Sequence, residues 1–258
     1  MMEDFEKFSC SDPDCRWRGL IRRQAVGMTA VCLKLDDVGI RLFHNSSKIK
    51  AGEVDGFFVK RYNLPGVVTQ IRRFFKSSRP LNVLYGAAHL ESLQIPTPRV
   101  LAALSAWQGL RRREYLVTEF LRENDRLMNE VFNSLPREEV WQMILEKFIP
   151  MLAKLHDSGA LHGDLNLRNL FLSAEGAAGL IDLDGMEISA FPLNMDKRAR
   201  EIARIVSSFL FKCRLFDRTA EYTAEALANY ARYADNTPDE KNTIGKTEIF
   251  ISRAKKYL

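Results

Sequence analysis

The sequence predicts an α+β protein whose first part is rich in strands and whose second part is rich in helices. Short β-prone runs, separated by turn residues, fill residues 28–61. A helical spacing of apolar residues runs through residues 141–155. Between the two parts lies the polar stretch 122–125, which we interpret as a linker. We therefore expect one domain at residues 1–121 and a second at residues 122–258.

The first domain is expected to hold strands, with two helices near its centre. Residues 1–27 are polar and mixed in charge, and they predict no definite element. The strand at residues 57–62 carries Lys60. The other predicted elements are strands at 30–33 and 40–43, a basic helix at 67–76, a helix at 81–93, and a strand pair at 100–107 and 115–121.

The second domain is expected to be helical. One long amphipathic helix is predicted from the apolar spacing of Trp141, Ile144, Leu145, Phe148, Leu152 and Leu155. Residues 196–211 predict another helix, with apolar residues inward and several arginines outward. Two further helices are expected at 219–233 and 246–257.

Between the predicted helices at 141–155 and 196–211, two acidic residues and one asparagine have the spacing of a phosphoryl-transfer site. Asp164 precedes Asn169 by five residues and Asp182 by eighteen. The apolar runs 170–172 and 178–181, joined by a turn about Glu175 and Gly176, read as a hairpin. Such a hairpin would bring Asn169 and Asp182 side by side at its open end, with Asp164 just before it.

This convergence predicts a catalytic site with a magnesium ion. Asp164 would face an attacking hydroxyl, while Asn169 and Asp182 would supply oxygen ligands to Mg²⁺. Taken singly, Asp164 or Asn169 could simply cap a turn, as Asp and Asn often do. Their combination across a hairpin favours the catalytic interpretation.

Composition limits the classes of partner. The chain of 258 residues is 46% apolar and 28% charged, with a formal net charge of +5, which favours an anionic partner. Zinc-finger spacing and aromatic–basic alternation are absent from the sequence, so no nucleic acid is expected. The N-terminus lacks a signal-peptide core, no apolar run reaches membrane-spanning length, and the four cysteines fit a reducing compartment. We expect a cytoplasmic protein, at most peripheral on the inner-membrane surface.

The motifs H-G-D-L-N-L-R-N and I-D-L-D-G, in this order of elements, resemble the protein-kinase-like superfamily. More narrowly, the chain resembles the bacterial Kdo/heptose lipopolysaccharide kinase family. The narrower resemblance rests on V-K-R-Y at residues 59–62 and I-P-T-P at residues 95–98, and it spans about residues 30–210. It implies a two-lobed protein-kinase-like fold, with a strand-rich N-lobe, a helical C-lobe and a catalytic cleft between them.

The resemblance also implies where ATP would bind. Lys60 would pair with the nucleotide phosphates, with Glu91 as the candidate acid that holds this lysine, although an exposed glutamate in a last helical turn is the equal alternative. A hinge at residues 118–121 would bind adenine through the backbone. Its candidate residues are Glu119, Phe120 and Leu121.

Several positions depart from the pattern of protein kinases. No G-x-G-x-x-G precedes Lys60, so Ser46 and Ser47 would cover the phosphates with hydroxyl and N–H groups. Residue 163 is glycine, where regulated kinases carry an arginine, and no A-P-E follows. These absences favour a small-molecule or glycan kinase over a phosphorylation-regulated protein kinase.

Three polar residues near the motifs have roles implied by the resemblance. Asn166 would orient the γ-phosphate or the catalytic loop. His162 would brace that loop through hydrogen bonds to the backbone. Asp184 is a second candidate metal ligand, with a poorer spacing than Asp182.

The expected reaction is transfer of the γ-phosphate of ATP to a sugar hydroxyl of an anionic glycan or glycolipid acceptor. A basic cluster formed by Lys197, Arg198, Arg200 and Arg204 could line the acceptor site, face an anionic leaflet, or be solvated surface. The alternatives are a kinase of aminoglycosides, choline or similar solutes, an atypical protein kinase of the RIO type, and a pseudokinase scaffold that binds nucleotide.

Overall fold

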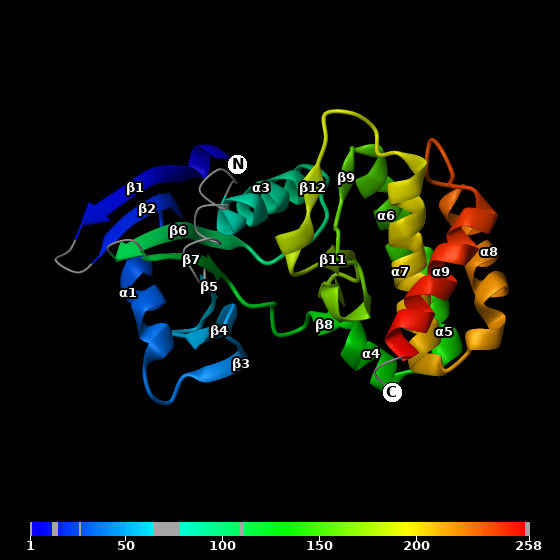
Figure 1. Cartoon of the computed structure of the whole chain (residues 1–258), viewed down its shortest axis with the longest axis horizontal. Coiled ribbons are helices and arrows are strands. Elements are labelled where there is room, and N and C mark those ends of the chain that lie inside the picture. The colour runs from blue at the N-terminus through cyan, green and yellow to red at the C-terminus, as the bar shows by residue number, and fades with distance from the viewer. Residues whose placement is uncertain (1, 12–14, 26, 64–77, 109–110, 256–258) are drawn as a thin grey trace. The chain divides into compact units, whose positions relative to one another are not determined.

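The computed structural model describes residues 2–11, 15–25, 27–63, 78–108 and 111–255. They form two compact units (Figure 1). A strand-rich unit comprises residues 1–89 and 98–121, and a helix-rich unit comprises residues 90–97 and 122–258. The expected α+β class is confirmed. The expected helix at 67–76 lies outside the described residues.

An antiparallel sheet of seven strands, in the order β1-β2-β6-β7-β5-β4-β3, forms the strand-rich unit. The polar segment before residue 27 contributes the edge hairpin β1–β2, which the sequence did not predict. The strands are β1 (Phe5–Ser11), β2 (Arg16–Arg22), β3 (Arg41–Asn45), β4 (Ile49–Val54), β5 (Phe57–Asn63), β6 (Val100–Gln108) and β7 (Arg111–Thr118).

Helix α1 (Met28–Leu33) stands where a strand was expected at 30–33, so that prediction is wrong. Val31 and Cys32 are β-prone when taken alone. Together with Met28 and Leu35, however, they follow the i, i+3, i+4, i+7 spacing of one helical face. All four are buried in the core of this unit, so packing against β5 and β7 overrides local strand propensity.

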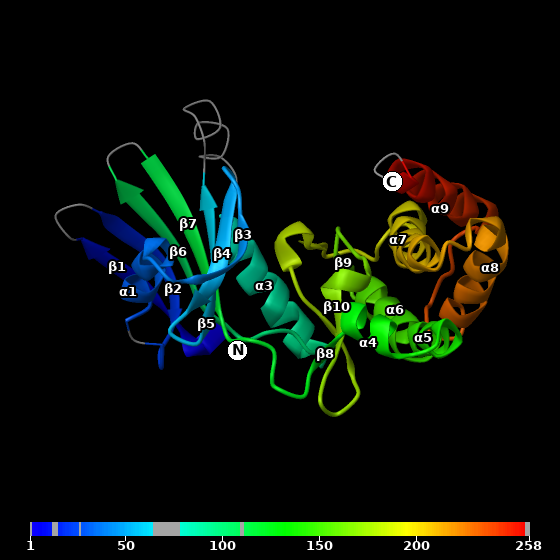
Figure 2. The same ribbon diagram turned by 90° about the horizontal axis from the view of Figure 1, so that it is seen from below.

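The helix-rich unit contains six helices and two small sheets within the described residues. In Figures 1 and 2, α7 runs alongside α9 and α8. The helices are α4 (Met128–Ser134), α5 (Arg137–Met143), α6 (Ile149–Asp157), α7 (Met195–Cys213), α8 (Thr219–Tyr230) and α9 (Glu240–Lys255), while α3 (Arg79–Ser92) begins in the strand-rich unit. The strands are β8 (Arg126–Leu127), β9 (Ala160–Leu161), β10 (Leu170–Leu172), β11 (Ala178–Leu180) and β12 (Glu187–Ile188).

The long helix expected over residues 141–155 is present as α5 and α6, joined by one π-helical turn at Ile144–Phe148. Pro150 has no N–H to donate to the preceding turn, and the wider π turn accommodates that loss. The predicted apolar stripe faces the core, since Ile144, Phe148, Leu152 and Leu155 have no exposed surface.

Helix α7 confirms the expected inward face, with Ile202, Ile205, Val206 and Phe209 fully buried. The expectation that its arginines point outward is wrong for Arg198, which is 1% exposed. A buried guanidinium is tolerated only when acceptors surround it. Arg198 meets this condition through the Asp157 carboxylate at 2.5 Å, the Tyr230 hydroxyl and backbone carbonyls.

Among the helices in the described ranges, none is long and apolar enough to cross a bilayer.

Candidate active site

The predicted hairpin is formed by β10 and β11. Leu170 pairs with Leu180, and Leu172 pairs with Ala178, across a five-residue turn. At the open end, the Ile181 N–H donates to the Asn169 carbonyl at 3.0 Å. Asn169 and Ile181, the residue before Asp182, are therefore tied together through the backbone.

Asp164 lies at the centre of a braced loop. The side-chain amide of Asn169 donates to the Asp164 carbonyl at 2.8 Å, and that of Asn166 donates to the same oxygen at 3.0 Å. The other atom of the Asn166 amide accepts from the Arg168 N–H, which caps a 3₁₀ turn at Leu167–Asn169. The Asn166 amide therefore contacts the loop backbone at two points, and its role in orienting the γ-phosphate or the catalytic loop stays a prediction.

His162 braces the same loop from its buried side. The Asp164 N–H donates to His162 Nδ1 at 3.3 Å, so the ring proton lies on Nε2. His162 Nε2 then donates to the Ile181 carbonyl at 2.9 Å. The ring thus joins the H-G-D loop to the hairpin through two hydrogen bonds.

Gly163 allows two backbone segments of the site to come into contact. Its φ is +84°, and a Cβ placed there would lie 2.1 Å from the Gly185 carbonyl oxygen. Residue 163 is therefore glycine for a steric reason, because the H-G-D loop and the D-G turn touch through their backbones. The same contact explains why no side chain stands where regulated kinases carry an arginine.

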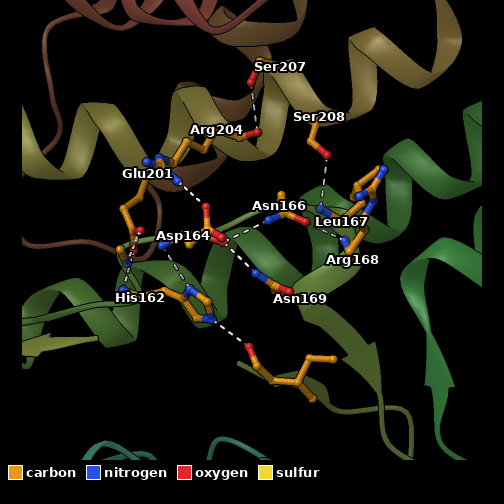
Figure 3. A network of polar contacts seen from close by, with 12 residues as sticks. His162, Asp164, Asn166, Leu167, Arg168, Asn169, Glu201, Arg204, Ser207 and Ser208 are labelled. Carbon is orange, nitrogen blue, oxygen red and sulfur yellow. Dashed lines mark hydrogen bonds and ion pairs between the residues drawn. The ribbon is translucent and has the colours of Figure 1, made fainter. Parts of the chain in front are cut away.

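One face of α7 holds the catalytic loop, and the sequence analysis did not foresee it (Figure 3). The Glu201 carboxylate accepts from the N–H groups of His162 and Gly163, both at 2.8 Å. One turn on, Arg204 contacts Asp164, and a further turn on, the Ser208 hydroxyl accepts from the Leu167 N–H at 3.1 Å. The sequence signal was the polar Glu201 beside the buried stripe of α7.

The Asp164 carboxylate faces solvent. Its side chain is 65% exposed, and Oδ1 accepts from Arg204 Nη1 at 2.7 Å. Three hydrogen bonds fix the backbone of Asp164, and the bond from Arg204 holds one oxygen of its exposed carboxylate, so the acid is held in place by its surroundings.

Behind Glu201 lies a buried polar network. Arg198 donates to the Tyr230 hydroxyl at 3.0 Å, so that hydroxyl donates to His156 Nδ1 at 2.9 Å. His156 Nε2 then lies 3.6 Å from Glu201 Oε2, beyond hydrogen-bond distance. Burial lowers the pKa of His156, and the nearby carboxylate opposes this only in part. Burial alone would raise the pKa of Glu201, but the His156 ring and the His162 N–H lower it further than burial raises it.

Asp182 begins the turn that follows β11. Its φ of 59° is left-handed, a conformation that Asp tolerates better than most residues. Asp184 lies two residues on, half-buried in a 3₁₀ turn at Leu183–Gly185. Within the described part of the chain, no three His, Cys, Asp or Glu side chains gather closely enough to hold a metal ion. A Mg²⁺ site of one carboxylate and the Asn169 oxygen suits an ion that keeps waters and phosphate oxygens.

The candidate nucleotide residues of the strand-rich unit are Lys60, Ser46, Ser47 and the segment after β7. Lys60 is half-buried on β5, with its ammonium 5.4 Å from the centre of the Tyr62 ring. The Ser46 hydroxyl closes the β3–β4 turn with Ile49, and both Ser46 and Ser47 are exposed.

Strand β7 ends at Thr118, so the candidate hinge follows it directly. The N–H of Glu119 donates to the Arg99 carbonyl, and Leu121 is half-buried. The Phe120 ring lies 6.0 Å from Phe43 and 6.2 Å from Phe58, in edge-on contact with both. Glu91 is exposed in the last turn of α3 and belongs to the helix-rich unit. The pairing of Glu91 with Lys60 stays a prediction.

Comparison with known proteins agrees with the motif pattern. The model of the lipopolysaccharide kinase (Kdo/WaaP) family matches residues 81–229, which is more than half of the chain. A 3-deoxy-D-manno-octulosonic acid kinase of Xanthomonas axonopodis pv. citri (strain 306) is 35% identical over 91 residues, or 35% of this chain and 34% of the relative. The Xanthomonas campestris pv. campestris (strain B100) kinase of the same name is 33% identical over 117 residues, or 45% and 44%.

The match to these curated relatives spans less than half of their length. Among solved structures, WbdD bound to the kinase inhibitor LY294002 aligns over 82% of this chain and 49% of its own, with 18% identity and a TM-score of 0.47. Vaccinia related kinase 3 aligns over 96% and 91%, with 11% identity and a TM-score of 0.41.

The α+β chain carries an H-G-D loop that is held by hydrogen bonds, next to the β10–β11 hairpin with Asn169 and Asp182 at its open end. This combination is typical of the kinase-like class. By its family match, the chain belongs to the lipopolysaccharide kinase (Kdo/WaaP) family.

Proposed function

We propose that this protein is an ATP- and Mg²⁺-dependent phosphotransferase that phosphorylates a sugar hydroxyl of the lipopolysaccharide inner core. The observation that carries the proposal is the open Asp164 carboxylate on a loop tied to Asn169 and the β10–β11 hairpin. Family membership supports the same reaction.

Asp164 would act on the acceptor hydroxyl. As that oxygen forms its bond to the γ-phosphorus, the hydroxyl proton passes to Asp164, the bond from the γ-phosphorus to the bridging oxygen breaks, and ADP leaves. Such catalysis depends on positioning. The hydrogen bonds from Asn166 and Asn169 to the Asp164 backbone provide it before the substrates arrive.

Asn169 Oδ1 and the Asp182 carboxylate would hold Mg²⁺, with Asp184 as a further oxygen donor. When bound, the ion neutralises charge on the triphosphate. Since the Asn169 amide is already fixed by its bond to the Asp164 carbonyl, its oxygen needs no reorganisation to act as a ligand.

In the strand-rich unit, Lys60 would neutralise phosphate charge as a point cation. The aromatic cluster of Phe43, Phe58 and Phe120 offers an apolar surface next to the candidate hinge, which suits an adenine ring. The β3–β4 turn with Ser46 and Ser47 would cover the phosphates through N–H groups.

The acceptor proposed from the curated relatives is 3-deoxy-D-manno-octulosonic acid in the inner core, an anionic sugar. A glycolipid acceptor would bring the protein to the cytoplasmic face of the inner membrane as a peripheral protein. The net charge of +5 agrees with an anionic partner.

The test is incubation of the purified protein with Mg-ATP and dephosphorylated lipopolysaccharide core, followed by mass spectrometry to locate new phosphate. We expect one phosphate on a sugar hydroxyl, and a loss of about 10³-fold or more for Asp164→Asn with the fold intact. Transfer to a soluble amino-alcohol or aminoglycoside instead would support a small-solute kinase. Nucleotide-induced stabilisation without transfer to any acceptor would support a pseudokinase.

A further inference from the structure

Arg204 has a different setting from its neighbours on α7. Arg198 is buried in the Asp157–Tyr230 network, and Arg200 is exposed and directed at Asp196, 3.5 Å away in the same helix. Arg204 instead contacts Asp164, the open carboxylate of the catalytic loop (Figure 3). Of the three arginines, it is therefore the one placed at the proposed reaction site.

The Arg204 guanidinium has donors beyond the one that Asp164 uses. Its Nη1 donates to Asp164 Oδ1 at 2.7 Å, whereas a guanidinium carries five N–H groups. Its Nε is buried and has no hydrogen-bond partner among the residues described. The guanidinium itself lies over the Phe250 ring, whose centre is 5.2 Å from Cζ, and this cation–π contact steadies it. The side chain is 27% exposed, so the group is held in place and still reachable.

An acidic acceptor creates an electrostatic problem at this site. Its own anionic group would approach the Asp164 carboxylate, and two like charges a few ångströms apart repel each other. A cation between them converts that repulsion into attraction. Arg204 lies against Asp164, and the planar guanidinium fork matches carboxylate geometry better than a lysine would.

We propose that Arg204 is a specificity-determining residue that holds Asp164 Oδ1 with one N–H and binds the carboxylate of a sugar-acid acceptor with its remaining donors. The acceptor hydroxyl is thereby placed against the other oxygen of Asp164. This inference rests on the proposed kinase function and specifies how that site selects an anionic sugar.

The experiment compares two acceptors that differ only in charge: a phosphate-free sugar acid of the inner core and the same sugar with its carboxyl converted to a primary amide. For each protein, kcat/KM is measured with both, and the acid-to-amide ratio is the readout. We expect the wild-type protein to prefer the acid and Arg204→Met to lower that ratio by about 10- to 100-fold, the range for a charge-assisted hydrogen bond. Arg204→Lys should keep part of the preference, since the charge remains and the fork is lost.

Arg200→Met, one turn earlier on the same helix, is the matched control and should leave the ratio unchanged. If Arg204 only orients Asp164, the variants will lose kcat equally on both acceptors and the ratio will stay at its wild-type value, which overturns this inference. Wild-type protein that phosphorylates neither acceptor contradicts the proposed function instead. Circular dichroism checks folding, and Arg204→Lys carries the comparison if Arg204→Met does not fold.

Discussion

At position 163, the absence of a side chain decides how closely two loops approach. Gly163 combines a positive φ with a backbone contact to Gly185, so two independent constraints meet at one residue. Positive φ alone costs a non-glycine residue about 1–2 kcal/mol. The steric contact adds to this, because the three nearest atoms all belong to the Gly185 backbone and cannot rotate aside.

Gly163→Ala should therefore destabilise the helix-rich unit by more than the cost of positive φ alone, about 3 kcal/mol or more. It should also lower kcat, since the loop carrying Asp164 must shift away from Gly185. The matched control is Gly176→Ala in the β10–β11 turn, where φ is +78° and the nearest atom to a new Cβ is the mobile Lys147 Nζ at 3.9 Å. Urea unfolding of both variants checks this: equal losses would show that the contact with Gly185 contributes nothing.

Helix α7 is the element that organises the catalytic loop. Glu201, Arg204 and Ser208 occupy positions i, i+3 and i+7, which share one helical face. Ile202, Ile205 and Phe209, the apolar residues of the same helix, are buried in the core. Their burial fixes the rotation of the helix about its axis. Burial of the apolar stripe therefore orients Glu201, Arg204 and Ser208 toward the catalytic loop. Packing of the core and the position of the loop are coupled through this one helix.

Two adjacent serines of α7 allow this coupling to be measured. Ser208 accepts from the Leu167 N–H in the catalytic loop, whereas the Ser207 hydroxyl donates to the Arg204 carbonyl within its own helix. Ser208→Ala should cost about 1 kcal/mol and lower kcat several-fold, because a loop N–H loses its partner. Ser207→Ala should leave kcat near the wild-type value. Steady-state kinetics on both variants tests the claim, and an equal effect of the two substitutions would argue against a role for α7 in holding the loop.

Glu201→Gln tests the same element more severely. The carboxylate accepts two loop N–H groups, whereas a glutamine offers one oxygen and would turn its NH₂ toward the second donor. We expect a loss of stability of about 1–3 kcal/mol and a fall in kcat. The KM for ATP should change little, since Glu201 contacts only the H-G-D backbone and the His156 network. A raised KM with unchanged kcat would contradict this assignment.

The elements that the sequence predicted are those whose cause is local. The β10–β11 hairpin follows from two apolar runs and a turn within a dozen residues, and the stripes of α6 and α7 follow from periodicity. The α7–loop contacts join residues about forty positions apart, so no periodic pattern reports them. Arg198 was placed outward because arginine is usually exposed, and only tertiary contacts with Asp157 and Tyr230 reverse that preference.

For the whole molecule, the buried polar network links stability to pH. His156 is fully buried and neutral. Its ring is hydrogen-bonded to the Tyr230 hydroxyl on one side and lies near the Glu201 carboxylate on the other. Its pKa in the folded protein lies below the ordinary value of about 6.5, because burial disfavours the charged ring. Below pH 6.5 the unfolded chain therefore binds a proton at His156 that the folded chain does not. The lowered pKa of Glu201 acts in the same direction at more acidic pH.

Stability should therefore be full above pH 6.5 and fall as the pH drops below it, by about 1.4 kcal/mol per pH unit from His156 until its folded pKa is reached. Urea unfolding followed by circular dichroism at 222 nm, which is dominated by the helices, gives this dependence between pH 7.5 and 5. His156→Gln should be less stable at pH 7.5 but should flatten the slope between pH 6.5 and 5, since glutamine does not titrate. His44→Gln, which replaces an exposed imidazole outside the buried network, is the control for the loss of a histidine. A slope that His156→Gln does not change would locate the acid sensitivity in other groups.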